Sequence, residues 1–240
     1  MRQRNICRQL AIGLLLFHLT SITQANVLGG WYLVNLNYHF TQKFTLYTEV
    51  QTRSQHVFDD FYYRELKGGL NYKLTDDMNV FVGYGNYKTY TYPGNYEKPV
   101  EVNENRLWEQ FVYTTNLGRI DIENRVSIEQ RWLNTVYHNR FRYRLALSIP
   151  VNRPKIQDKT FFPVAFDEVF FTNKGPYFLR NRIFGGAGFR FAKVATVQMS
   201  FLRQSDFFAD GSSAGKNFFT TSLLLSAGNP QKKQHLSDAD

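Results

Sequence analysis

The sequence has 240 residues, of which 17% are aromatic and 20% charged, with a formal net charge of +9. This length fits one domain, or two at most. Its single cysteine excludes a disulfide-stabilised scaffold, and beyond the N-terminal segment no apolar stretch is long enough to cross a membrane as a helix.

The first 25 residues are typical of a secretory signal peptide. Arg2, Arg4 and Arg8 form a basic segment, residues 10–19 are apolar, and residues 23–25 resemble a small-residue cleavage site. We therefore expect residues 1–25 to be a signal peptide that contains the only cysteine, Cys7. Because Cys7 is not at the cleavage site, a lipid-anchored cysteine is not expected, and export makes nucleic acid an unexpected partner despite the positive charge.

From residue 26 onward the sequence is a succession of strand patterns separated by turn signals. We expect eleven segments to be strands: 31–40, 44–55, 61–74, 78–92, 106–117, 119–132, 138–149, 161–172, 179–191, 194–208 and 217–226. We therefore expect one domain over residues 26–227, followed by a polar, disordered tail at 228–240.

The clearest alternation lies in residues 119–132. Positions 121, 123, 125, 127, 129 and 131 are all polar and mostly charged, whereas most positions between them are β-branched, and only a strand separates side chains in this way. The next pattern, 138–149, places Arg140, Arg142 and Arg144 on one face and apolar residues on the other. A soluble sheet would bury the apolar face, whereas a membrane barrel turns that face toward lipid.

The membrane barrel fits better, because the strand patterns have about ten residues or more and aromatic residues gather near their ends. The fold predicted is all-β: a single antiparallel, up-and-down transmembrane β-barrel with short periplasmic turns and longer outer loops. Residues 41–43, 75–77, 117–119 and 192–193 are the expected tight turns, and 56–60, 93–103, 133–138, 173–177 and 209–216 the longer loops. Residues 151–159 are an exception, because this longer segment falls on the side where tight turns are expected.

The number of strands is also ambiguous at this point. Eleven patterns are visible, but bacterial single-chain barrels have an even number of strands. The prediction is therefore 10–12 strands. Either two strands are merged near residues 151–172, giving twelve, or one pattern lies outside the wall, giving ten.

A charged set falls on the predicted inward faces, because a charge facing lipid near the midplane costs about 2–4 kcal/mol. The candidate site is this lumen charge cluster: Glu49, Arg53, Glu123, Arg125, Glu129, Arg131, Arg142, Arg144, Arg180 and Arg182. Glu65, Lys67 and Arg190 lie on the same faces. Two interpretations are open: a lumen filled by ion pairs, which we favour, or an anion-selective passage or ligand pocket, since Arg outnumbers acid.

Three acidic residues have ambiguous orientations. Glu109 is in phase with apolar residues, and a bulge near Trp108 would resolve the conflict. Asp167 and Glu168 are adjacent and cannot both face inward on a regular strand.

Several segments together resemble the family called domain of unknown function 2490. They are the opening Trp31 strand, Glu49 with Arg53, residues 106–110 (Arg-x-Trp-Glu-Gln), the strand from Arg125 to Arg131, Arg140-x-Arg142-x-Arg144, Asp167-Glu168, and Arg180 with Arg182. The resemblance covers residues 29–226. It implies an outer-membrane β-barrel of the kind found in Bacteroidetes-type and other Gram-negative bacteria, and it implies no activity.

Residues for catalysis or metal binding are not evident, so no catalytic residue, metal or cofactor is assigned. A barrel-wall hydrolase needs a serine beside a histidine on the outer surface. The only His-x-Ser sequence, at 235–237, lies in the tail, and cross-strand pairing of His39 or His138 with a serine has no support in the sequence. The acidic pairs at 59–60 and 76–77 are interpreted as turn formers, and the glycines at 83, 85, 185, 186 and 188 precede no helix that could cradle phosphate.

The sequence therefore predicts an exported outer-membrane barrel, acting as a structural protein or a narrow, anion-preferring pore. The expected partners are outer-membrane lipids, with room for a small solute or ligand. The alternative functions are a barrel-wall lipid-modifying hydrolase and a soluble, exported lipid carrier. The ligand and the oligomeric state are left open.

Overall fold

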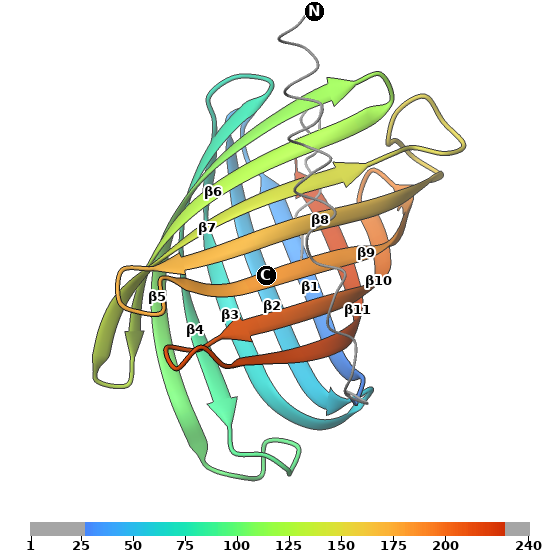
Figure 1. Cartoon of the computed structure of the whole chain (residues 1–240). Coiled ribbons are helices and arrows are strands. Elements are labelled where there is room, and N and C mark those ends of the chain that lie inside the picture. The colour runs from blue at the N-terminus through green and yellow to red at the C-terminus, as the bar shows by residue number, and fades with distance from the viewer. Residues whose placement is uncertain (1–26, 229–240) are drawn as a thin grey trace, which may run out of the picture.

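The computed structural model describes residues 27–228, which form eleven strands closed into one barrel (Figure 1). The strands are β1 (Gly29–His39), β2 (Phe44–His56), β3 (Asp59–Lys73), β4 (Met78–Tyr90), β5 (Val100–Leu117), β6 (Ile120–Leu133), β7 (Val136–Ser148), β8 (Thr160–Thr172), β9 (Phe178–Ala192), β10 (Ala195–Phe207) and β11 (Ser213–Gly228). The predicted signal peptide and the predicted tail beyond residue 228 lie outside the described residues. Within the described range, no helix is long and apolar enough to cross a membrane.

The all-β barrel prediction is confirmed, and each predicted strand pattern corresponds to one strand. Sequence neighbours pair antiparallel, and the barrel closes where β1 pairs with β11 in parallel, from Gly29 opposite Phe218 to His39 opposite Gly228. In an up-and-down chain with an odd number of strands, the first and last strands must run in the same direction. The count of eleven lies within the predicted range, but the expected even number is wrong.

The connections lie at two ends of the barrel, which we call end A (40–43, 74–77, 118–119, 149–159 and 193–194) and end B (57–58, 91–99, 134–135, 173–177 and 208–212). Two predicted longer loops are wrong, because residues 56–60 and 133–138 contain the two-residue turns 57–58 and 134–135. The loop predicted at 93–103 is shorter, since β5 begins at Val100. The two ends therefore differ less in loop length than the sequence suggested.

The long connection at 149–159 is held by an arginine from the neighbouring turn. Arg119 Nη2 donates hydrogen bonds to the carbonyl oxygens of Pro150, Val151 and Arg153 at 2.7, 3.2 and 2.6 Å. Ile156 packs against the apolar cluster of the barrel interior. These contacts give the exceptional connection a defined conformation at end A.

The two faces of the wall have opposite chemistry. Apolar side chains point outward, as at Val50 and Leu66, whose exposed fractions are 57% and 63%. The interior holds an apolar cluster on β1 and β7–β11: Trp31, Leu33, Ala146, Phe162, Val164, Phe166, Phe184, Leu202, Phe218 and Leu224. The remaining interior wall, chiefly β2, β3 and β5–β9, carries charged side chains that form the candidate site.

Candidate functional site: the charged lumen

All ten residues of the predicted lumen cluster point into the barrel. Glu123, Arg131 and Arg180 are half-buried and the other seven are buried. Alternation explains this placement, because successive strand residues face opposite sides and the intervening apolar residues occupy the outer face. The structure then distributes the ten among several ion-paired groups.

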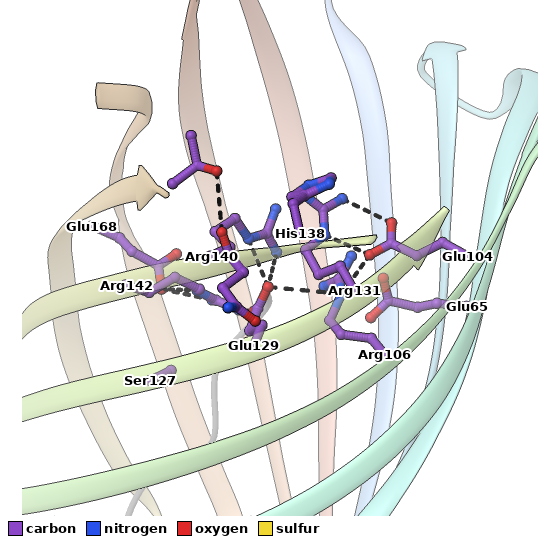
Figure 2. A network of polar contacts seen from close by, with 12 residues as sticks. Glu65, Glu104, Arg106, Ser127, Glu129, Arg131, His138, Arg140, Arg142 and Glu168 are labelled. Carbon is purple, nitrogen blue, oxygen red and sulfur yellow. Dashed lines mark hydrogen bonds and ion pairs between the residues drawn. The ribbon is translucent and has the colours of Figure 1, made fainter. Parts of the chain in front are cut away.

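Glu129 on β6 is the centre of the largest group (Figure 2). Its Oε2 lies 2.6 Å from Arg140 Nη2 and its Oε1 lies 2.7 Å from Arg142 Nη1, both on β7. Arg106 Nε on β5 lies 3.7 Å from Oε2. The Glu129 side chain is only 1% exposed, so these guanidinium groups neutralise a carboxylate that water barely reaches.

Two further carboxylates extend the group along the wall. Glu168 on β8 accepts a hydrogen bond from Arg142 Nη2 at 2.6 Å, and its Oε2 lies 3.7 Å from Arg182 Nη1 on β9. In the other direction, Glu104 on β5 lies 3.0 Å from Arg106 Nε and 2.5 Å from Arg131 Nε. The contacts therefore run continuously from β5 to β9.

A second group joins β2 and β3. Lys67 Nζ lies 2.7 Å from Glu49 Oε1 and 3.0 Å from Glu65 Oε1, with all three side chains buried. The Tyr63 hydroxyl donates to Glu65 Oε2 at 2.5 Å. Arg53 stacks on the Trp31 ring, 3.5 Å from its centroid. Arg53 Nη2 also lies 3.7 Å from Glu65 Oε2, so Lys67 and Arg53 together neutralise the two carboxylates of this group.

Glu123 forms a smaller group nearer end A. Arg144 Nη2 and Arg125 Nη2 donate to its Oε1 at 2.9 and 3.1 Å. At end B, Arg180 pairs with Asp206, and Gln204 also donates to that carboxylate at 2.9 Å. Together these contacts place each of the ten predicted residues in an ion pair or beside an aromatic ring.

Among residues 27–228, the buried charged side chains are eight of Arg or Lys and five of Glu. Part of the excess positive charge lies against aromatic faces, which attract cations. Arg106 lies 3.7 Å from the Tyr87 ring centroid, and Arg182 lies 4.9 Å from Trp31 and 4.8 Å from Phe170. Paired charges and stacked rings suit a rigid, filled interior better than a water-lined passage.

The three ambiguous acidic residues have definite orientations. Glu109 is exposed on the outer face, opposite Val82 and Ile128 in register, and Asp167 is also exposed there. Glu168 is buried inside. The bulge expected near Trp108 is wrong, because the register of β5 with both neighbours is continuous through that residue.

A serine and a histidine do meet, at the β1–β11 seam near end A. His39 Nε2 lies 3.0 Å from Ser226 Oγ, and His39 Nδ1 lies 2.7 Å from Thr45 Oγ1. His39 is buried on the inner wall, and the group beyond the ring is a hydroxyl where a hydrolase triad has a carboxylate. Among residues 27–228 no group of three or more His, Cys, Asp or Glu side chains could hold a metal ion.

Comparison with known proteins places the chain in a family. The sequence matches the model of DUF2490, described as a protein of unknown function, over residues 28–214. The chain belongs to this family. No curated protein matches it. Among solved structures, it is similar to LpxR from Salmonella typhimurium, with 9% identity, a TM-score of 0.47, and coverage of 75% of this chain and 83% of that one.

Four residues of the β5–β9 network in this DUF2490 protein were not among the ten predicted: Glu104, Arg106 and Arg140, and also Glu168, whose orientation the sequence left ambiguous. Glu104 lies on β5 before the predicted start of that strand, and Arg106 was predicted as its first residue without being assigned to the lumen cluster; the alternation of 104, 106 and 108 was the available signal. Arg140 lies on the same face as Arg142 and Arg144 and belonged to the same pattern. Periodicity could therefore have placed these residues inside, but it could not identify their partners.

Proposed function

We propose that this DUF2490 protein is an exported outer-membrane β-barrel whose lumen is closed by its own ion-paired side chains. It would then serve as a structural membrane protein and not as an open pore. The observation that carries this proposal is the burial of the Glu129 group on the inner wall, where a conducting barrel would need its charged side chains to contact water.

The outer face supports a membrane location. Large apolar side chains cover it, and aromatic pairs occur at both ends: Phe40 stacks with Phe44 at end A, and Trp132 packs against Tyr137 at end B. An apolar band between two aromatic belts is the pattern of a transmembrane barrel. A soluble lipid carrier would instead need the apolar face to point inward.

The two other functions fit less well. An anion-preferring pore would need Arg142 and Arg144 to contact solution, but these residues are only 4% and 1% exposed. A barrel-wall hydrolase would need a Ser–His pair on the outer surface, whereas His39 and Ser226 point inward. A hydrogen bond that ties the first strand to the last is the better interpretation of that pair.

Single-cysteine labelling in lipid vesicles tests both parts of the proposal. Cys7 is the only cysteine in the sequence, so a chain without residues 1–25 offers a clean background. Leu66→Cys probes the outer face, Ser127→Cys the interior and Ser212→Cys an exposed loop. We expect a charged, water-soluble maleimide to label only the loop, and an apolar maleimide to label position 66 as well.

Each part of the proposal can fail separately. Rapid labelling of position 127 by the charged reagent would show water in the lumen and contradict the closed barrel. Equally rapid labelling of position 66 would contradict the membrane location. Full labelling of all three positions after unfolding is the control that each thiol is reactive.

A further inference from the structure

Two basic residues lie directly opposite each other on the outer face near end B. Arg64 on β3 pairs in register with Lys88 on β4. Arg64 is exposed and Lys88 is half-buried. The same row continues to Thr52 on β2 and Asn103 on β5, so it contains no carboxylate.

This arrangement opposes folding unless something neutralises it. Like charges directly opposite each other on neighbouring strands are destabilising. No described acidic side chain forms an ion pair with either residue, in contrast to the interior, where basic side chains cluster around carboxylates. The missing negative charge would therefore come from outside the chain.

The guanidinium of Arg64 is held in place by aromatic residues. It lies 5.2 Å from the Tyr90 ring centroid and 6.0 Å from that of Tyr96, and the two rings are 5.0 Å apart. Such contacts orient an arginine and leave its N–H groups free to bind an anion. The basic pair is therefore more than two mobile surface side chains.

The connection 91–99 positions this aromatic support. The Tyr96 amide donates to the carbonyl oxygen of Phe61 at 3.1 Å, and its hydroxyl donates to that of Tyr63 at 3.1 Å. The Asn95 side-chain oxygen accepts a hydrogen bond from the Phe61 amide at 2.8 Å. The loop thus folds back onto β3 beside Arg64.

The basic pair lies at the edge of the apolar band. The next outward row toward end A contains Val34, Val50 and Leu66, which face one another in register and are exposed. On β4 and β5, Asn86 donates to Asn103 and Asn105 at 3.0 and 2.9 Å and provides further polar surface beside the pair. Aromatic, amide and basic side chains above an apolar band match the headgroup level of a bilayer.

We propose that Arg64 and Lys88 form a binding site for the phosphate group of a lipid in the leaflet around end B. The flat fork of an arginine and the point charge of a lysine are the standard partners of phosphate oxygens. The apolar row below would receive the acyl chains. This inference rests on the proposed membrane location, because the lipid must be presented along the outer wall.

Lipid titration of the purified full-length protein in neutral maltoside micelles tests the site. The probes are phosphatidic acid, the zwitterionic lipid phosphatidylcholine, and inorganic phosphate, with binding followed by native mass spectrometry and by the shift in unfolding temperature. Arg64→Gln/Lys88→Gln is the test variant. Arg153→Gln/Lys155→Gln removes the same charge from exposed residues at end A and is the matched control.

We expect phosphatidic acid to bind the wild type and the control variant equally. The test variant should bind it at least about tenfold more weakly, because both basic residues that attract the anionic headgroup are gone. Equal binding by both variants would overturn the site. If inorganic phosphate raised the unfolding temperature as much as phosphatidic acid does, the pair would be a free-anion site, and the assignment to lipid would be overturned.

Two controls separate a lipid site from a structural role of the pair and from a failure of the membrane location. Without lipid, the test variant should unfold at the same temperature as the wild type or higher, because a repulsion is removed. A marked decrease would assign the pair a structural role and overturn the site.

Flotation with liposomes tests the membrane location separately. A protein that floats but shows no preference for phosphatidic acid contradicts the lipid site alone, whereas a protein that does not float contradicts the proposed function.

Discussion

The substitution Glu129→Gln tests how the lumen is stabilised. It keeps the shape of the side chain but removes the charge that Arg140, Arg142 and Arg106 share. Arg142 keeps Glu168 as a partner, and Arg106 keeps Glu104. For Arg140, which is buried, the contacts with Glu129 are the only ion pairs within the described network, so its charge would be left without a counterion.

The expected cost follows from this loss. Removing one partner of a buried ion pair typically destabilises a protein by about 3–5 kcal/mol, because the remaining charge has no compensation. An exposed pair contributes about 0–1 kcal/mol. Asp158→Asn supplies that comparison, since Asp158 is 48% exposed and lies 3.9 Å from Arg190 Nε.

Equilibrium unfolding in urea, measured in lipid vesicles by tryptophan fluorescence, would give both free energies. We expect Glu129→Gln to lose about 3–5 kcal/mol and Asp158→Asn less than about 1 kcal/mol. Adding Arg140→Met to Glu129→Gln should recover most of the loss, because the uncompensated cation is then gone. A cost below about 1 kcal/mol for Glu129→Gln would refute the reasoning, because the lumen would then screen charge as water does.

Three further substitutions have clear expectations. Gly186→Ala should prevent or strongly impair folding, because the added Cβ would lie 2.2 Å from a side-chain carbon and 2.3 Å from a carbonyl oxygen of β10. The control, Gly185→Ala, adds a Cβ with nothing within 4 Å and should refold normally. A heat-modifiability gel would measure the folded fraction of both variants. Arg119→Ala should speed tryptic cleavage at Lys155, because the connection 149–159 loses three hydrogen bonds; unchanged cleavage would mean that other contacts hold it. Glu109→Leu should raise the unfolding free energy in vesicles by about 1 kcal/mol or more, because the proposed membrane location turns this exposed carboxylate toward lipid; a decrease would show that Glu109 has a partner there.

Strand positions could be predicted well because the two faces of this wall differ in chemistry at nearly every residue. The run from Ile120 to Leu133 alternates charged with apolar residues and became β6, and Arg140, Arg142 and Arg144 marked the inner face of β7. Where the alternation was weaker, as before Arg106, the beginning of β5 was missed. Local periodicity therefore predicted which residues lie inside.

The odd strand number was visible as eleven patterns, but the even number usual for bacterial single-chain barrels argued against it, so the parallel pairing of β1 with β11 was not expected. The ion-pair partners could not be predicted from local periodicity, because they depend on contacts between distant segments. The turn at 57–58 contains Phe58 with a φ of 64°, a backbone conformation for which glycine or asparagine is the usual signal. Likewise, Glu104 meets Arg131 only because of the register between β5 and β6.

The closed lumen is tested most directly by planar-bilayer conductance of the refolded chain, with insertion verified independently by protease protection. We expect no discrete current steps for the wild type, because in the proposed closed barrel the Glu129 group fills the lumen. A variant that removes Glu129, Arg140 and Arg142 together, each replaced by alanine, should show steps. Stable, anion-favouring steps from the wild-type protein that weaken when Arg142 and Arg144 are replaced would contradict the closed barrel and establish a pore.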